Sequence, residues 1–406
     1  MKKLLVRGGR PLFGKIDLQG SKNAALPIIF ATIITRGVST LKNVPDITDV
    51  TVALDIICDM GASVTREGST LYINTERLVY KTPNEACVSK IRASTYLLGA
   101  CLGRFGIAEI MNFGGCDFGT RPIDLHIAAA LSLGAVQEDE RLLAKNLTGG
   151  KISLKKPSVG ASVNAIIMSC CAEGSTEIYG YAKEPHVYSV IDYLKSCGAS
   201  ITEQDERLII EQKPLLGGEY TVIPDMIEAG TYLLLCILGE GGISVTSSVA
   251  PSLRSFICAA ADSGIAITAD GTQLTFFGRP TRAFSVTTAP YPGYPTDLQP
   301  QLAPLMAMYF GGEIRETVWQ GRFGYLGELE RFGIKSVTDG PLAKILPSHL
   351  KPARVSAPDL RGGAACLFAA LLTKGESEIY SADYLLRGYS RLEENLTSLG
   401  ADVKII

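Results

Sequence analysis

A repeated unit of nearly constant length constrains the fold of this chain more than any other sequence feature. Six times along its 406 residues, an apolar run that suits a helix ends at a glycine, and a short stretch typical of a β-strand follows. Since a unit of this size cannot bury its own apolar faces, the copies must pack against one another. The strand-like segments are residues 37–41, 106–110, 174–178, 242–246, 312–316 and 375–379, and their first residues lie 69, 68, 68, 70 and 63 apart by subtraction.

Each unit also contains a second helical pattern that ends at a second glycine. Such a glycine suits the left-handed position that follows the last turn of a helix. The pattern predicts an α/β fold with three units per domain, in which the apolar first helices lie inside and the strands outside. An open α/β sheet with coincidental glycine spacing is the alternative. The second glycines are Gly61, Gly134, Gly198, Gly264, Gly333 and Gly400.

The boundary between two domains is expected after the third unit, near residues 222–225. No Ser-rich or Pro-rich linker marks it. The first twenty residues precede the first helix and have the pattern of a displaced strand that could belong with the second half. The predicted domains are therefore residues 21–224 and residues 1–20 together with 225–406, which suits the usual domain size of about 100–200 residues.

Charge and apolar content exclude several classes of protein. The chain has 39 Lys and Arg against 41 Asp and Glu, a formal charge of −2, and lacks the basic stripe that nucleic acid or an anionic membrane requires. Its longest apolar runs, such as residues 26–34, have about half of the ~20 residues that cross a bilayer, and no signal-peptide core follows Met1. We therefore expect a cytoplasmic protein that binds neither nucleic acid nor membrane.

The ten cysteines do not form a recognisable framework. No C-x-x-C pair occurs, and most cysteines lie in apolar runs, where a thiol behaves as a small hydrophobic group. Neither disulfides nor a zinc site are expected, and we predict no bound metal. The cysteines in apolar runs are Cys58, Cys101, Cys170, Cys171, Cys236, Cys258 and Cys366.

Polar residues, three of them cationic, stand where the apolar helices begin. Free backbone N–H groups and the helix dipole favour anions at such positions. The repeat would bring equivalent helix starts to one face of each domain, which indicates an anion-binding site. Helix caps and surface charges are the alternative reading of each single residue. The residues are Lys22, Asn23, Arg92, Ser158, Ser162, Asp297, Asp359 and Arg361.

The glycine-rich segment 114–126 contains a cysteine, Cys116, five residues before Arg121. Nearby cations lower the pKa of a thiol from about 8.5, so that it can act as a nucleophile or general acid near neutral pH. A cysteine that is merely tolerated in a loop is the alternative. The surrounding residues favour the reactive thiol.

In these motifs the chain resembles the enolpyruvyl transferases, and among them the branch that acts on a UDP-sugar. The resemblance covers essentially the whole chain. It implies two inverted α/β barrel domains, each with three helix–strand units around buried helices, and an active site in the cleft between the domains. The motifs that carry it are residues 20–27, 92–94, 114–126, 158–161, 223–225, 228–231, 292–297, 359–361 and 387–389.

The resemblance implies transfer of the enolpyruvyl group of phosphoenolpyruvate to the 3′-hydroxyl of UDP-N-acetylglucosamine, with release of phosphate and without a cofactor. This chemistry needs an acid for the methylene carbon, a base for the hydroxyl, and cations for a phosphate and a carboxylate. By match to the family motifs, Cys116 is the acid and forms a covalent adduct, and Asp297 is the base. Catalysis by residues from both halves predicts closure on substrate binding.

The resemblance also implies the residues that bind the two substrates. For phosphoenolpyruvate they are Lys22, Asn23, Arg121, Arg361 and Arg387, of which Lys22 and Arg387 are also placed in the catalytic set. For the UDP-sugar they are Asn23, Arg92, Arg121, Pro122, Ile123, Asp124, Leu125, Lys156, Pro157, Ser158, Val159, Asp297 and Val318. Arg322 and His126 are expected as further groups of the cleft.

Five positions depart from the family pattern: Asp117, Val163, Met226, Gly321 and Leu386. An aspartate beside the reactive thiol would raise the pKa of that thiol if the side chains approach. The other four replace polar or charged residues near the expected sugar site. They leave open a related transferase that uses another nucleoside or nucleotide-sugar acceptor, or a non-catalytic relative. The branch that acts on shikimate 3-phosphate is disfavoured, because the cysteine loop is intact.

Overall fold

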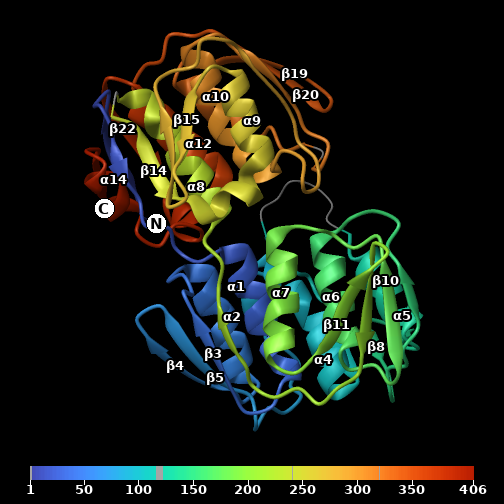
Figure 1. Cartoon of the computed structure of the whole chain (residues 1–406). Coiled ribbons are helices and arrows are strands. Elements are labelled where there is room, and N and C mark those ends of the chain that lie inside the picture. Colours follow the sequence, from blue (N-terminus) through green and yellow to red (C-terminus); the bar gives the residue numbers. More distant parts are fainter. Residues whose placement is uncertain (1, 116–121, 240, 320) are drawn as a thin grey trace. The chain divides into compact units, whose positions relative to one another are not determined.

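The structure is a computed structural model that describes residues 2–115, 122–239, 241–319 and 321–406. The chain divides into two compact units, residues 20–223 and residues 1–19 with 224–406. We refer to them as the N-unit and the C-unit. Each contains three small sheets arranged around three buried helices (Figure 1).

In the N-unit, the three buried helices are the predicted first helices of the repeats. The first is α1 (Lys22–Ala31), extended by the 3-10 turn η1 (Thr32–Ile34), the second is η2 (Arg92–Tyr96) with α4 (Leu97–Phe105), and the third is α6 (Val159–Ser169). The helices α2 (Thr48–Asp59), α5 (Asp124–Ser132) and α7 (Pro185–Ser196) are each buried on one side only, and α3 (Glu85–Val88) is a single turn.

The three buried helices of the N-unit contact one another at equivalent positions of the repeat. A Cβ atom at Gly103 would lie 3.0 Å from Cys171 Sγ and 3.4 Å from Ile34 Cγ2. These three residues occupy equivalent positions, 69 and 68 residues apart by subtraction. The three helices therefore approach closely at this point, where an added side chain would crowd Cys171 and Ile34.

The sheets of the N-unit follow one plan. In two of them, the strand after the first glycine pairs antiparallel with the last strand of its repeat and parallel with one further strand. Their orders are β13-β3-β5-β4, β6-β8-β7 and β11-β12-β10-β9. The strands are β3 (Val38–Lys42), β4 (Ser63–Glu67), β5 (Thr70–Asn74), β6 (Ile107–Glu109), β7 (Val136–Glu138), β8 (Arg141–Leu143), β9 (Lys151–Ser153), β10 (Ser175–Tyr179), β11 (Ser200–Gln204), β12 (Arg207–Glu211) and β13 (Glu219–Thr221).

The C-unit repeats this arrangement. Its buried helices are α8 (Met226–Leu233) with η3 (Leu234–Leu238), η5 (Thr296–Leu298) with α10 (Gln299–Met308), and α12 (Leu360–Leu372). Its other helices are η4 (Ser247–Leu253) with α9 (Arg254–Asp262), α11 (Leu326–Arg331), α13 (Asp383–Leu386) and α14 (Leu392–Ser398).

The sheets of the C-unit have the orders β15-β16-β14-β2, β17-β18-β20-β19 and β21-β22-β1-β23. The strands are β1 (Leu4–Gly8), β2 (Gly14–Lys15), β14 (Ile243–Thr246), β15 (Ala266–Ala269), β16 (Gln273–Phe277), β17 (Phe284–Thr287), β18 (Gly312–Arg315), β19 (Lys335–Asp339), β20 (Leu342–Leu346), β21 (Arg354–Ser356), β22 (Gly375–Tyr380) and β23 (Asp402–Ile405).

The amino-terminal segment completes the C-unit, as its strand pattern suggested. Strand β1 pairs antiparallel with both β22 and β23, and thereby supplies the missing member of the sixth repeat. Strand β2 lies parallel to β14. In the same way β13, which directly precedes the C-unit in the sequence, pairs with β3 of the N-unit.

The predicted glycines have the backbone geometry that the repeat requires. All six second glycines have positive φ, from 86° at Gly134 to 102° at Gly61, Gly198 and Gly400. Five of the six first glycines do as well, and in the fifth repeat Gly311, with φ 70°, takes this role from Gly312. The α/β fold class with three units around buried helices is confirmed. The described strands form six separate sheets rather than a closed barrel, because helices fill each interior.

Two of the cysteines assigned to apolar surroundings are exposed, namely Cys58 and Cys258. Each lies in a helix whose neighbouring apolar residues face inward, Ile57 in α2 and Phe256 in α9, while the cysteine points outward. The nine cysteines in the described part of the chain are free thiols. Across the ranges given above, no helix is both long enough and apolar enough to span a bilayer.

Candidate active site

Three aspartates mark the starts of the three buried helices in the C-unit, but they have different partners. Asp225 caps α8 by accepting the N–H groups of Ile227 (2.8 Å) and Glu228 (3.1 Å). Asp359 caps α12 through the N–H groups of Arg361 and Gly362. Asp297, in η5, instead bonds to the side chains of Arg322 and Arg361.

Asp297 lies between two arginines. Its Oδ1 accepts a hydrogen bond from Arg322 Nη2 at 2.8 Å, and its Oδ2 accepts from Arg361 Nη2 at 3.0 Å and Nε at 3.2 Å. Both guanidinium groups are almost fully buried, whereas the Asp297 side chain keeps 27% exposure. Such charge-assisted bonds hold all three planar groups in fixed orientations.

The two arginines determine the ionisation of this carboxylate. Burial alone would raise the pKa of Asp297, but the charges of Arg322 and Arg361 hold that pKa well below its usual range. Burial would conversely lower the pKa of Arg361, while Asp297 raises it above the ordinary value. Asp297 is therefore ionised near neutral pH, and its pKa would rise if one of the arginines withdrew from it.

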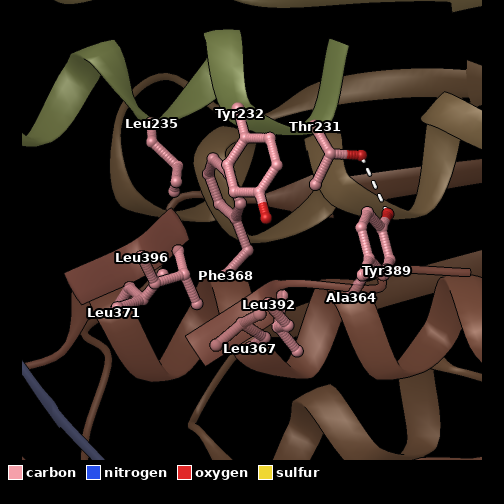
Figure 2. A pocket seen from close by; sticks show the side chains of 10 residues that line it. All are labelled: Thr231, Tyr232, Leu235, Ala364, Leu367, Phe368, Leu371, Tyr389, Leu392 and Leu396. Atoms are coloured by element: carbon pink, nitrogen blue, oxygen red, sulfur yellow. Dashed lines mark hydrogen bonds between the residues drawn. The ribbon is translucent and has the colours of Figure 1, made fainter. Parts of the chain in front are cut away.

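Tyr389 is a further hydrogen-bond partner of Arg361. Its hydroxyl accepts a hydrogen bond from Arg361 Nη1 at 3.4 Å and shares another with Thr231 Oγ1 at 3.0 Å. Figure 2 shows this pair of hydroxyl groups at the edge of a pocket whose other walls are almost entirely apolar. Such walls offer few groups for a phosphate or a sugar, so we interpret the pocket as core packing behind the Asp297 cluster. Its lining residues are Thr231, Tyr232, Leu235, Ala364, Leu367, Phe368, Leu371, Tyr389, Leu392 and Leu396.

Of the C-unit residues predicted for the site, Asp297, Arg322 and Arg361 are brought into direct contact. Arg387 is half-buried at the end of α13, two residues before Tyr389. Val318 is half-buried, and its N–H donates to Glu316 Oε1 at 2.8 Å. This set offers cations and one carboxylate, as the expected chemistry requires.

The sequence analysis missed Glu316, a buried acidic residue beside this cluster. A comparison of the six strand-like segments could have identified Glu316. The fifth residue of each strand-like segment is Leu41, Ile110, Ile178, Thr246, Glu316 and Ile379, so Glu316 is the charged member of an otherwise mostly apolar set. A buried charge at such a position indicates a specific set of hydrogen-bond donors.

In the N-unit, Lys22 begins α1 and forms an ion pair with Asp49 Oδ2 at 2.9 Å. Both side chains are mostly buried, with 15% and 4% exposure. Asn23 follows on the first turn of the same helix and is half-buried. An ammonium group held in this way at a helix start is suited to a phosphate or carboxylate.

A second group of predicted N-unit residues gathers around His126. This side chain is 6% exposed, and a Cβ atom at Gly160 would lie 2.7 Å from its Nε2, so α5 and the start of α6 are in close contact. Burial, together with the nearby charge of Arg92, lowers the pKa of His126 to about 4. His126 is therefore neutral near pH 7. Arg92 itself begins η2 and donates to the carbonyl oxygen of Phe113 at 3.4 Å.

The remaining nucleotide-sugar positions lie on the segments that lead into α5 and α6. Ser158 caps α6, and its hydroxyl accepts from the N–H of Ala161. The other described positions are exposed or half-buried, as a binding surface requires. They are Pro122, Ile123, Asp124, Leu125, Lys156, Pro157 and Val159. Ser162, expected at this helix start, lies inside α6 and accepts from the N–H of Ala182 at 2.8 Å.

Three of the site predictions lie outside the described residues, namely Cys116, Asp117 and Arg121. The other departures from the family pattern are placed differently from one another. Val163 is fully buried in the core of the N-unit, and Met226 and Leu386 are half-buried. Gly321 has φ 81°, a conformation that glycine and asparagine adopt more readily than other residues.

No group of three or more His, Cys, Asp or Glu side chains with the arrangement of a metal site occurs within residues 2–115, 122–239, 241–319 and 321–406. Among those residues the charged groups of the candidate site include arginine, lysine and aspartate side chains. This donor set suits anionic substrates.

Comparison with known proteins places these observations in a family. The family described as EPSP synthase (3-phosphoshikimate 1-carboxyvinyltransferase) matches residues 6–396. A UDP-N-acetylglucosamine 1-carboxyvinyltransferase of Halothermothrix orenii is 40% identical over 100% of this chain and 99% of its own length. The enzyme of the same name from Clostridium botulinum is 38% identical over 99% of each chain.

Solved structures share the fold. The enolpyruvyl transferase NikO from Streptomyces tendae superposes with a TM-score of 0.88 at 25% identity, covering 100% of this chain and 99% of its own. An EPSP synthase from Acinetobacter baumannii gives a TM-score of 0.73 at 16% identity over the whole of both chains, a likeness that concerns the fold alone.

Proposed function

Because this chain belongs to the EPSP synthase family of carboxyvinyltransferases, we propose that it transfers the enolpyruvyl group of phosphoenolpyruvate to the 3′-hydroxyl of UDP-N-acetylglucosamine and releases phosphate. The proposal includes the first committed step of peptidoglycan synthesis, and hence a role in cell-wall formation, cell shape and division. It also includes a cytoplasmic location and no cofactor.

One observation carries the proposal beyond the family. Asp297 is held between Arg322 and Arg361 at 2.8 Å and 3.0 Å, which places an ionised carboxylate among cations at the start of a buried helix. The reaction needs a base for the sugar hydroxyl beside groups that bind a phosphate and a carboxylate. The full-length relatives named as UDP-N-acetylglucosamine 1-carboxyvinyltransferases support the choice of acceptor.

The first step is an addition to phosphoenolpyruvate. Cys116 gives its proton to the methylene carbon, the 3′-oxygen of the sugar bonds to the neighbouring carbon, and Asp297 takes the hydroxyl proton. The second step is an elimination. The Cys116 thiolate left by the first step takes a proton from the new methyl group, and the carbon–carbon double bond re-forms. The bond to phosphate breaks with its electron pair leaving on the phosphate, which takes up the proton held by Asp297. Cys116 has a second proposed role as the residue that forms a covalent adduct.

Asp297 cannot accept a proton easily while both arginines hold it, because each guanidinium stabilises its charge. We expect the phosphate or carboxylate of phosphoenolpyruvate to draw Arg361 or Arg322 toward itself. The weakened pairing would make Asp297 more basic when the substrate is bound. Proton transfer would in this way depend on occupancy of the anion site.

The remaining roles follow the resemblance. Lys22, Arg121 and Arg387 bind phosphoenolpyruvate, with Asn23 and Arg361 beside them. The UDP-sugar is bound by the loops before α5 and α6, together with Arg92 and Val318. Fosfomycin, an epoxide analogue of phosphoenolpyruvate, would alkylate Cys116. A transferase with another nucleoside or nucleotide-sugar acceptor is the alternative, because Met226 and Leu386 replace an arginine and an aspartate that the family pattern favours.

The test is product identification. The protein is incubated with phosphoenolpyruvate and UDP-N-acetylglucosamine, and the nucleotide products are separated and weighed by mass spectrometry. The proposal expects a product heavier than the acceptor by one enolpyruvyl group, together with one phosphate released per product. An unchanged nucleotide after prolonged incubation with the wild-type protein contradicts the proposal.

A further inference from the structure

We propose that Glu316 is a positioning residue for the reaction. Its carboxylate fixes the Thr296 hydroxyl as an acceptor for Arg322, and so holds Arg322 against Asp297. This inference rests on the proposed function for its catalytic consequence, and on the hydrogen bonds of the C-unit for its geometry.

Glu316 is surrounded by donors. It follows β18, is 2% exposed, and its own N–H bonds to the carbonyl oxygen of Pro341 at 2.7 Å. Its Oε1 accepts from Thr288 Oγ1 at 2.8 Å, from the N–H of Val318 at 2.8 Å and from the N–H of Trp319 at 3.0 Å. Its Oε2 accepts from Thr296 Oγ1 at 2.7 Å. A buried carboxylate with four such donors is fully satisfied without a cationic partner.

The Thr296 hydroxyl connects this carboxylate to the Asp297 cluster. Arg322 Nη1 lies 2.8 Å from Thr296 Oγ1, and a guanidinium nitrogen can only donate. Because a hydroxyl has a single hydrogen, and Thr296 gives it to Glu316, its lone pairs face Arg322. The same guanidinium then directs Nη2 to Asp297 Oδ1 at 2.8 Å. The charge of Glu316 thereby fixes the direction of every bond in the series.

The same carboxylate also holds the segment that carries Val318, a residue expected to bind the nucleotide sugar. Two backbone N–H groups of this segment bond to Oε1. Glu316 therefore sets the position of an acceptor-binding loop and of the base through one side chain. Errors of about 1 Å in such positions can reduce turnover by about 10²-fold.

Glu316→Gln tests the direction of the bonds with little change of shape. The amide oxygen is needed where two backbone N–H groups converge, so the amide nitrogen would face Thr296. Thr296 Oγ1 would then meet donors from both sides, and its hydrogen would lose its acceptor. We expect kcat to fall by at least 10-fold while the melting temperature changes by only a few degrees.

Two further comparisons separate positioning from a general effect of charge or folding. Glu313→Gln removes the same charge at an exposed site in β18, three residues earlier, where Glu313 pairs with Lys344 at 3.6 Å, and should leave kcat unchanged. Thr296→Val removes the hydroxyl and should reproduce the loss seen with Glu316→Gln. Thr296→Ser retains the hydroxyl and should restore most of the activity, which a merely structural role of Thr296 would not predict.

A crystal structure of the Glu316→Gln protein gives a readout that does not depend on activity. The inference expects Arg322 to have left either Thr296 or Asp297. The inference is overturned if Arg322 keeps its original place in this structure and if Glu316→Gln and Thr296→Val both retain the wild-type kcat. If the wild-type protein forms no product, the proposed function fails, while the position of Arg322 still decides the inference. If Glu316→Gln does not fold, the pair Thr296→Val and Thr296→Ser decides it by kcat.

Discussion

Replacement of the buried Glu228 by glutamine should stabilise the C-unit, which is the opposite of what most changes in a protein core do. Glu228 lies on α8 at 2% exposure, and its Oε2 accepts the N–H of Gln19 at 2.8 Å. Burial raises its pKa from 4.5 to about 8, the charge of Asp225 adds to this, and the Gln19 N–H and Arg391 act against it. Glutamine retains the oxygen that accepts this bond and cannot ionise.

The expected gain in stability follows from the pKa shift of Glu228. Folded protein binds a proton on Glu228 between pH 4.5 and about 8 that unfolded protein has released, so stability falls as pH rises through this window. One pKa unit corresponds to about 1.36 kcal/mol. The buried Glu228 therefore lowers the free energy of unfolding by roughly 3 kcal/mol at pH 7 and by roughly 5 kcal/mol at pH 9. Below pH 4.5 Glu228 is protonated in both the folded and the unfolded protein, and this loss of stability disappears. Glu228→Gln should therefore gain stability at pH 9 and match the wild type near pH 4.5.

The assay is urea unfolding followed by tryptophan fluorescence at several pH values. Trp319 is the single tryptophan of the chain and belongs to the C-unit, so its signal reports the unfolding of that unit. Glu394→Gln, an exposed change on α14, is the control and should shift the unfolding midpoint little at any pH. A Glu228→Gln protein that is no more stable than wild type at pH 9, with the same dependence on pH, would refute the reasoning.

Three other predictions concern the site and the helix packing. Asp297→Ala should lower turnover by about 10²–10⁴-fold, while calorimetry still shows binding of UDP-N-acetylglucosamine. Near-normal turnover would contradict the assignment of Asp297 as the base. Cys116→Asp should retain turnover and abolish inhibition by fosfomycin, and inhibition that survives would show that Cys116 is not its target. Gly99→Ala would place a Cβ atom 2.7 Å from Asn164 Oδ1, whereas Gly327→Ala meets nothing within 4 Å. Thermal melting should show a loss of about 1–3 kcal/mol for Gly99→Ala and no loss for Gly327→Ala; equal stability would contradict the close helix packing.

Local patterns in the sequence predicted the architecture well, because each repeat carries its own signals. The second glycines, from Gly61 to Gly400, all have the left-handed conformation that ends a helix. The repeat also predicted that the first helices are buried. Cys58 and Cys258 were assigned wrongly, because apolar neighbours in the sequence do not share one face of a helix.

The arrangement of the candidate site could not be predicted from local patterns. Arg361 is 64 residues from Asp297 and belongs to the next repeat, so the packing of two repeats brings them together. Thr296 and Glu316 are 20 residues apart at opposite ends of one helix–strand unit, and only the folding of that unit brings them together. The resemblance indicated Asp297 and Arg361 as site residues but not their contact. Tyr389 belonged to a quoted motif, yet its bond to Arg361 appears only in the folded C-unit.

The rate of phosphate release with different acceptors tests the central claim most directly. Wild-type protein is given phosphoenolpyruvate with UDP-N-acetylglucosamine, with shikimate 3-phosphate or with UMP, and phosphate is measured in each reaction. The account predicts rapid release with UDP-N-acetylglucosamine and background release with the other two. Release with another acceptor but not with UDP-N-acetylglucosamine, or with none of the three, would contradict it.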